Sequence, residues 1–382
     1  MIDDLQRQAR YCQSTSPLYA ALFAILTGIC RAHDEGQDDV ALKGFFEILG
    51  HCWQGRRFTA WFERPLLLAG AIHEQVLCGH APELARFYAT CGGQFDAAQA
   101  GALAGALQTA LMKRHQAMAP FLSQPGIQTN ESARGLTWLL PLLAHWRAAD
   151  RPPLSLIELG CSAGLGLVAD HYGYQVALPD DQLWTQKGAP SFALRVQGRG
   201  AARAGVDLTD MAALGKAVKT RTGCDLRPLD CADANQKRLL EALIWGDNAP
   251  RLERLRAAMA TRTGTMLRFE RGDMVDCVQQ LAQSPAAYAP MICTFNTIAS
   301  CYLDDAHYGR LRAAIAAAFH GPWADKDCLW IEFEMPRAGE ALPNHARDGE
   351  VLIRVHERGA GSGLQTRYFG AAAAHPETIT VF

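Results

Sequence analysis

The stretch Leu154-Ser-Leu-Ile-Glu-Leu-Gly-Cys-Ser-Ala-Gly-Leu-Gly166 decides the fold of this chain. It begins as an apolar run with an acid, Glu158, near its end, which is typical of a buried strand. Gly160 and Gly164 then let the backbone approach a ligand without a Cβ in the way, and Leu165 lies in an expected helix. A strand, a tight glycine turn and a helix N-terminus together predict a site for a nucleotide-type ligand.

Composition limits the classes of protein to which the chain can belong. Its 382 residues are 49% hydrophobic and 20% charged, which is enough for two domains with sizeable cores. The net charge of -2 gives no basic field for nucleic acid or an anionic membrane, so a small-molecule substrate is the expected partner. Its 12 cysteines lie mostly in apolar contexts, and we expect them to be reduced. With no signal peptide and no membrane-length apolar run, the expected location is cytoplasmic.

The texture of the sequence changes near residue 150. Residues 1–148 carry apolar side chains at helical spacing and predict an all-α helical cap domain. Residues 149–382 alternate strands with helices, which predicts an α/β domain around a mostly parallel sheet. The segment 174–213 is hard to assign; it is either a strand region of the main sheet or an insertion, and we favour an insertion.

The elements expected in the second domain follow from this alternation. The strands are Ser155–Leu159, Thr222–Leu226, Met266–Glu270, Met291–Asn296, Leu329–Glu334, Val351–Val355 and Ile379–Phe382. The helices are Gly164–Asp170, Ala234–Trp245, Pro250–Ala260, Val275–Ala282 and Tyr308–Phe319. The last two strands follow each other without a helix, so we expect them to form an antiparallel hairpin through the glycines at 359–363.

Two further interpretations of the glycine turn compete with a nucleotide-type site. Gly160-Cys-Ser-Ala-Gly164 also matches the Gly-x-Ser-x-Gly elbow of a serine hydrolase. Ser162, Asp273 or Asp305, and His375 even follow the chain order of that catalytic triad. Against it, such enzymes build several strands before the elbow, whereas a helical domain precedes it here. In the other interpretation, the glycines only allow close packing of helix on strand.

Polar residues at the ends of later strands favour a methyl-donor site. Glu158 precedes the turn, where such a site needs an acid. Asp225 ends the second expected strand and could accept ribose hydroxyls, and Asp273 follows the third and could accept an adenine amino group. Asn296 ends the fourth strand, where a reactive methyl would lie, with Tyr302 just beyond it. Each residue alone is a weak signal, since an Asp after a strand is more often a turn-former or an N-cap, but in register with the glycine turn they indicate one site.

Residues 150–382 therefore resemble the class I S-adenosylmethionine-dependent methyltransferases, which implies a Rossmann-like domain and that cofactor. Ser162 stands where typical members have glycine, so its side chain must be accommodated beside the methionine part of the cofactor. The resemblance implies the cofactor-binding residues Glu158, Gly160, Ser162, Gly164, Asp225 and Asp273.

Nearly the whole chain is similar to an uncharacterised family, domain of unknown function 2332, which implies a fold and a ligand pocket but no reaction. Gly166 departs from the Asn that ends this family's turn. The motifs that carry the resemblance are Ser16-Pro-Leu-Tyr19, Gln128-Thr-Asn-Glu131, residues 158–165, Tyr172-Gly-Tyr174, Gly223–Asp230, Trp245, the arginines of 251–256, Arg271-Gly-Asp273 and His375-Pro376.

The functional hypothesis is methyl transfer from S-adenosylmethionine to a small molecule. Asn296 and Tyr302 would orient the acceptor, and Glu131 would remove a proton or hold a cationic substrate. Glu332 and Glu334 project from one side of their strand and are either pocket acids or partners of arginine. We expect no metal, since no ligand motif is present. A serine hydrolase and a noncatalytic adenosyl-ligand-binding protein remain as alternatives.

Overall fold

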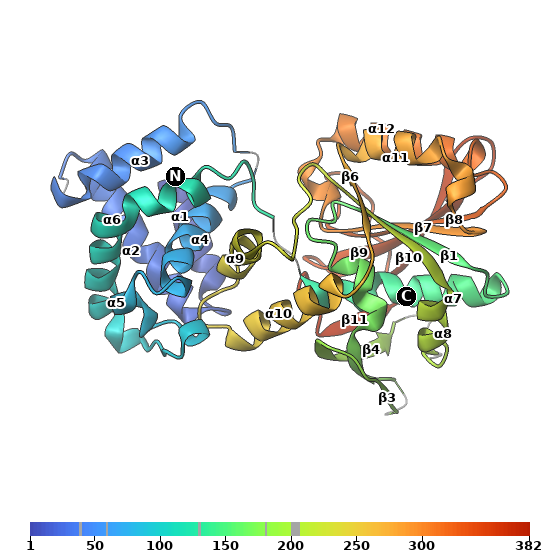
Figure 1. Cartoon of the computed structure of the whole chain (residues 1–382), viewed down its shortest axis with the longest axis horizontal. Helices are drawn as coiled ribbons and strands as arrows, with labels where there is room; N and C mark the ends of the chain where they lie inside the picture. Colours follow the sequence, from blue (N-terminus) through green and yellow to red (C-terminus); the bar gives the residue numbers. More distant parts are fainter. Residues whose placement is uncertain (38–39, 59, 129–130, 180–181, 200–206) are drawn as a thin grey trace. The chain divides into compact units, whose positions relative to one another are not determined.

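The computed structural model describes residues 1–382 except 38–39, 59, 129–130, 180–181 and 200–206 (Figure 1). The chain divides into two compact units. The first, called here the helical unit, consists of Met1–Thr129 and Ala232–Arg256. The second, the sheet unit, consists of Asn130–Cys231 and Ala257–Phe382. The boundary expected after residue 148 falls at the end of helix α7, inside the sheet unit.

The helical unit contains the helices expected in the first third of the chain. Ser16 caps α2 by accepting the backbone N–H of Tyr19 at 3.3 Å, and Pro17 opens the helix with no N–H to lose. The elements are α1 (Ile2–Cys12), α2 (Pro17–Asp34), η1 (Val40–Leu42), α3 (Lys43–Trp53), α4 (Glu63–Leu77), α5 (Pro82–Ala85), η2 (Ala89–Cys91), η3 (Ala97–Gln99) and α6 (Ala100–Leu122).

A segment from the second half of the chain completes the helical unit. It contains α9 (Ala234–Ala242) and the start of α10 (Ala249–Thr263). The hydroxyl of Ser16 donates to the Asp247 carboxylate at 2.7 and 2.8 Å. Tyr19 packs against Trp245 with ring centroids 4.4 Å apart. Two motifs far apart in the sequence thus meet in one buried polar and aromatic contact, which a domain boundary drawn from composition does not anticipate.

Eleven strands form one sheet in the described part of the sheet unit, in the order β3-β2-β4-β11-β10-β9-β8-β7-β1-β5-β6. Most neighbouring pairs are parallel, and the run β6-β5-β1-β7-β8 is entirely so. An α/β domain with a mostly parallel sheet is therefore confirmed. The strands are β1 (Leu154–Leu159), β2 (Gly173–Ala177), β3 (Leu183–Gln186), β4 (Ser191–Gly198), β5 (Val218–Asp225), β6 (Arg268–Arg271), β7 (Met291–Thr297), β8 (Asp327–Glu334), β9 (Val351–Arg358), β10 (Leu364–Ala372) and β11 (Thr378–Val381).

Three local features differ from the expected elements. The segment expected as an insertion supplies β2, β3 and β4 to the same sheet, with β4 pairing with β11. The hairpin through the glycines at 359–363 joins β9 to β10, a strand that sequence patterning missed because its first half is polar and exposed. The helix expected after the glycine turn is the 3-10 helix η5 (Gly166–His171), since the next strand begins at Gly173.

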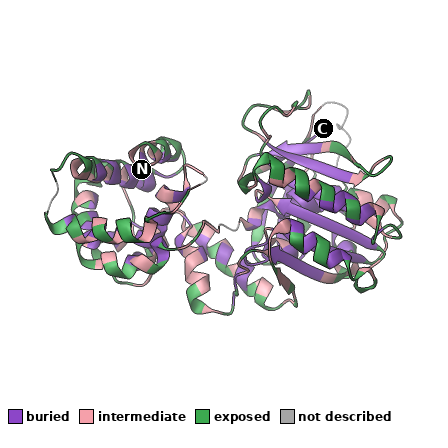
Figure 2. Cartoon of the chain, turned by 90° about the horizontal axis from the view of Figure 1, so that it is seen from above, coloured by how far each residue is buried: buried purple, intermediate pink, exposed green. Residues whose placement is uncertain are grey.

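Helices cover both faces of the central strands. On one face α11 (Met274–Ala282) and α12 (Asp305–His320) pack over a core that includes Ile157 and Ile292. On the other face α7 (Gly135–Ala148) places Trp138 on Phe295, with ring centroids 4.1 Å apart. Figure 2 shows the strands buried and the outer sides of the helices exposed. The remaining short elements are η4 (Ser132–Arg134), α8 (Met211–Ala217), η6 (Pro285–Ala287) and η7 (Ser300–Tyr302).

Candidate functional site

The central parallel strands deliver polar residues to one edge of the sheet. β1 lies between β5 and β7, so the direction in which the chain builds the sheet reverses beside β1. In open α/β sheets, ligands bind at the carboxyl ends of the strands at such a switch point. Glu158, Asp225, Asn296 and Glu334 lie at or near the carboxyl ends of β1, β5, β7 and β8.

The glycine turn after β1 has an uncommon backbone. Gly160, Ser162 and Gly164 have φ values of 72°, 49° and 72°, and the left-handed region is costly for a serine. Asp225 stabilises the turn, because its Oδ2 accepts the Ser162 N–H at 2.8 Å. Its Oδ1 accepts the Arg227 N–H, also at 2.8 Å. The acid expected to bind ribose therefore holds two backbone loops in place.

Asp273 is also engaged by the protein itself. It caps α11 by accepting the Val275 N–H at 2.8 Å. Its carboxylate lies 2.9 Å from the Nε2 atom of His307, which comes from the start of α12. The acid expected to contact adenine is thus at the sheet edge, with a histidine as its partner.

Glu158 and Ser162 place two unsatisfied oxygens beneath the turn. The side chains are 4% and 6% exposed, and Glu158 Oε2 and Ser162 Oγ have no hydrogen-bond partner among the described residues. Burial raises the pKa of Glu158 well above its usual range, the Asp225 charge adds to this, and the N–H of Leu167 opposes it. Unpartnered buried oxygens are rare in folded proteins and suit a site that a ligand completes.

The space beside the glycines is filled by side chains. A Cβ added to Gly160 would lie 2.5 Å from Ala299 Cβ and 3.0 Å from Met274 Cε. One added to Gly164 would lie 2.8 Å from Leu267 Cδ2. In this conformation the glycines let neighbouring segments pack against the turn, and Ala299 and Met274 occupy the space beside Gly160.

Asn296 is buried among polar groups of β8. Its side-chain amide donates to Glu334 Oε1 at 2.7 Å and accepts from Trp330 Nε1 at 2.8 Å. The residue is 0% exposed, and its hydrogen bond to Oε1 holds Glu334 in position. In this conformation both ends of its amide are engaged within the protein.

Glu334 collects backbone N–H groups from the loop that follows β7. Its Oε1 accepts from Ala299 at 2.7 Å and Ser300 at 2.9 Å, and its Oε2 from Cys301 at 3.3 Å. Burial raises the pKa of Glu334 and the nearby Glu332 charge adds to the rise, although these N–H groups oppose it. No basic side chain of the described residues pairs with this acid.

Glu332 has a different environment one pleat away. It accepts from Tyr308 OH at 2.7 Å and lies 2.8 Å from His356 Nε2. Burial would raise its pKa, but the hydrogen bonds and charge of these neighbours outweigh burial and lower it. Burial lowers the pKa of His356, whereas its hydrogen bond to Glu332 and the charge of that carboxylate oppose burial.

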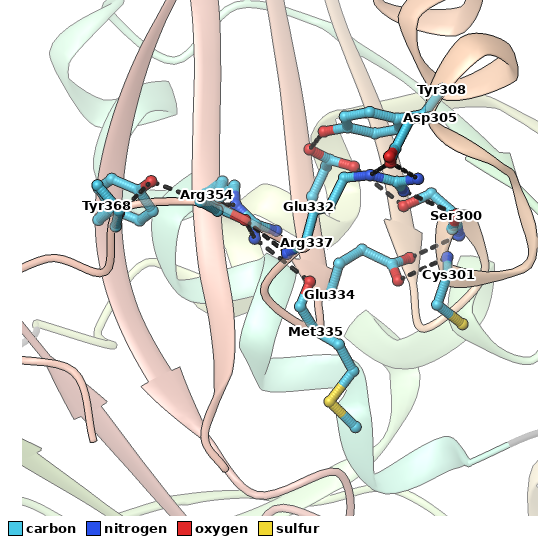
Figure 3. Close-up of polar contacts among 12 residues, drawn as sticks. Ser300, Cys301, Asp305, Tyr308, Glu332, Glu334, Met335, Arg337, Arg354 and Tyr368 are labelled. Atoms are coloured by element: carbon cyan, nitrogen blue, oxygen red, sulfur yellow. Dashed lines mark hydrogen bonds and ion pairs between the residues drawn. The ribbon is translucent and has the colours of Figure 1, made fainter. Parts of the chain in front are cut away.

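A cavity of about 270 Å³ adjoins this cluster (Figure 3). It lies at the carboxyl end of β8, between the loop after β7 and the start of α12. The lining residues are Ser300, Cys301, Asp305, Tyr308, Glu334, Met335, Pro336, Arg337, Ala338 and Arg354.

Two arginines form the charged wall of the cavity. Arg337 bonds Asp305 at 2.8 Å and lies over the Tyr308 ring, with its guanidinium carbon 4.3 Å from the centroid. Arg354 bonds Glu340 at 2.8 and 2.6 Å in a bidentate pair. Each arginine therefore forms an ion pair with a carboxylate, whereas Glu334 forms no ion pair with any described residue.

Glu131 and Tyr302 complete the predicted residues. Glu131 accepts the N–H of Ala133 at 3.1 Å, and its other oxygen lies 2.8 Å from His375 Nδ1. Two of the family-like motifs, more than 200 residues apart, thus meet at this pair. Thr129 and Asn130 of the first motif lie outside the described residues. Tyr302 ends η7 and is 40% exposed.

The groups of the hydrolase alternative have other partners. His375 lies against Glu131, Asp273 against His307, and Asp305 against Arg337. Among the described residues Ser162 Oγ contacts no histidine, since it has no hydrogen-bond partner at all.

Sequence reasoning singled out Glu332 and Glu334 but missed the residues that surround them. His356 and Arg354 lie on β9, where the register places Arg354 opposite Glu332 and His356 opposite Trp330. The available signal was the alternation of basic residues within the apolar strand Val351–Arg358, matching the alternation of acids on β8.

These features define an α/β protein with a buried polar cluster at the carboxyl edge of its sheet. The chain belongs to the family of uncharacterized proteins conserved in bacteria, DUF2332, whose model matches residues 3–380. No curated protein and no solved structure matches it. Among the described residues, no helix is long and apolar enough to cross a membrane, and no cluster of three or more His, Cys, Asp or Glu could hold a metal ion.

Proposed function

We propose that the sheet unit is a Rossmann-like methyltransferase-type domain that transfers a methyl group from S-adenosylmethionine to a small molecule. The observation that carries the proposal is the glycine turn at the β1 switch point of the parallel run β6-β5-β1-β7-β8. The two unpartnered oxygens beneath it, Glu158 Oε2 and Ser162 Oγ, support a polar ligand there.

The cofactor suits these oxygens but not the space beside Gly160, which Ala299 and Met274 fill. The proposal therefore requires the loop after β7 to move away from the turn when the cofactor binds. Ile298 in that loop has a φ of 50°, which is strained for a β-branched residue and fits a segment with a second conformation.

The chain's own residues would align and enclose the reactants. Transfer from a sulfonium is an in-line displacement, so holding donor and acceptor in line and excluding water supplies most of the catalysis. The cavity beside Glu334 lies behind the same loop and suits the acceptor.

Isothermal titration of the full chain with S-adenosylmethionine and S-adenosylhomocysteine tests the proposal. We expect binding that raises the melting temperature, and a loss of at least tenfold in affinity in Glu158→Gln, which keeps size but changes the buried acid. Asp348→Asn, the same replacement of an acid by its amide but on an exposed loop, is the control and should bind as the wild type does.

A third variant distinguishes a cofactor site that is blocked by the loop after β7 from the absence of a cofactor site. Ala299→Gly removes the methyl group that packs on Gly160 and should bind at least as tightly as the wild type. If neither ligand binds the wild type or this variant, the methyltransferase proposal is wrong. Binding without methyl transfer to any metabolite fraction would favour a noncatalytic adenosyl-ligand-binding protein.

A further inference from the structure

Glu334 is the one acid of the cavity wall that has no cationic partner among the described residues. Its Oε1 is saturated by N–H groups of Asn296, Ala299 and Ser300. Its Oε2 accepts only the Cys301 N–H, and at the longer distance of 3.3 Å. A buried carboxylate is stable only when paired or hydrogen-bonded, so Oε2 lacks a strong donor.

Arg354 supplies a cationic group to the lining of the same cavity. Its Nε and Nη2 bond Glu340, and Nη2 also donates to the Met335 carbonyl at 3.3 Å. These bonds use Nε and Nη2; the Tyr368 hydroxyl, itself a donor to Glu340, is another polar group beside this guanidinium, and the side chain is only 5% exposed. Guanidinium N–H groups in such a position bind carboxylates well.

Arg337 does not compete for the same ligand. Its Nε and Nη2 bond Asp305, while Nη1 and Nη2 reach the carbonyls of Ser300 and Leu303. It lies over the Tyr308 ring. Glu334 and Arg354 are therefore the charged groups of the lining that can accept from, or donate to, a ligand.

We infer that this cavity binds a small zwitterionic amine of the α-amino acid class, with its ammonium group on Glu334 Oε2 and its carboxylate toward Arg354 Nη1. The ammonium group supplies the cation that Glu334 lacks, and a ligand of zero net charge leaves the other ion pairs balanced. The volume of about 270 Å³ restricts the ligand to a small molecule, since pockets for drug-sized ligands hold about 300–1,000 Å³.

The inference names the class of the small-molecule substrate. The role of the amino acid as methyl acceptor rests on the proposed function, whereas its binding does not. Binding of the amine requires no methyl donor, so it can be measured in the absence of S-adenosylmethionine.

The test is a thermal-shift screen of the full chain with the standard amino acids, each added singly, followed by titration calorimetry of those that raise the melting temperature. We expect at least one to bind. Its deaminated carboxylic acid and its decarboxylated amine should each bind at least tenfold more weakly, because each lacks one of the two charged groups. These ligand comparisons use the wild type and do not depend on any variant folding.

Variants then locate the site. Glu334→Gln and Arg354→Lys should each weaken binding of that amino acid at least tenfold, whereas Glu357→Gln, on β9 outside the cavity lining, should leave it unchanged.

Two results would overturn the inference. One is that no amino acid shifts the melting temperature; the other is that the isolated amine or carboxylate binds as tightly as the zwitterion. Failure of S-adenosylmethionine to bind would count against the proposed function alone.

Discussion

Replacing Gly160 by alanine probes the packing of the loop after β7 on the glycine turn. The new Cβ has two unfavourable consequences. It lies in the left-handed region, with φ at 72°, and it approaches Ala299 Cβ to 2.5 Å and Met274 Cε to 3.0 Å. Contacts below 3 Å force a neighbour to shift, and Met274 is flexible at that end whereas Ala299 Cβ is fixed to the backbone.

The size of the effect follows from these two terms. An alanine with positive φ costs about 1 kcal/mol, and overpacking adds about 1–3 kcal/mol. The expected loss in the free energy of unfolding is therefore about 2–4 kcal/mol. For domains of roughly 150–250 residues, that corresponds to a fall of about 4–16 °C in melting temperature.

Two matched variants in the same unit separate the terms, measured by calorimetry and urea unfolding. Gly361 has a φ of 66° and nothing within 4 Å of an added Cβ, so Gly361→Ala should cost only about 1 kcal/mol. Gly309 lies within α12 with open space and ordinary φ, so Gly309→Ala should be neutral or stabilise by up to about 1 kcal/mol. If Gly160→Ala is no worse than Gly361→Ala, the turn is not packed shut and the requirement for loop movement is refuted.

Two other predictions concern stability. His145 lies 3.0 Å from both Asp327 and Glu357; hydrogen bonding to Asp327 is the main cause that raises its pKa, against the effect of burial. Because the folded-state pKa is raised, this stabilisation is fully present below about pH 6 and disappears as pH rises through the folded-state pKa. His145→Gln should therefore lower stability at acidic pH and converge on the wild type at alkaline pH in urea titrations; a constant difference would contradict this. Ser16→Ala removes a helix cap and a hydrogen bond to the Asp247 carboxylate, and should lower the free energy of unfolding in urea by about 2–3 kcal/mol. An unchanged free energy of unfolding would contradict this contact.

Much of the fold was predictable because the central strands are buried on both sides. β1 is buried at every position, and such strands appear in sequence as continuous apolar runs. β10 was missed because its first residues are exposed and polar, and β3 is a short strand at the edge of the sheet with no buried residue. β4 alternates exposed and buried residues, but this pattern does not show to which sheet the strand belongs. The sequence pattern also cannot show that β11 pairs with β4, because the two strands are far apart in the chain.

The candidate site was only partly predictable. Two acids at i and i+2 on a strand must share a face, so Glu332 and Glu334 were correctly grouped. Their different partners, His356 for one and backbone N–H groups for the other, depend on the register of β8 with β9 and on the path of a loop. Neither is encoded at fixed spacing in the chain.

The sequence by itself determined the helical first third, the α/β alternation after it and the glycine turn, because each depends on local periodicity or on backbone conformations that glycine favours. Only the tertiary structure decided that the segment Ala232–Arg256 joins the helical unit, that Asp225 holds backbone N–H groups, and that Glu334 and Arg354 line one cavity. These features arise from contacts between residues far apart in sequence, where burial and hydrogen bonding select one partner among many of the same chemical type.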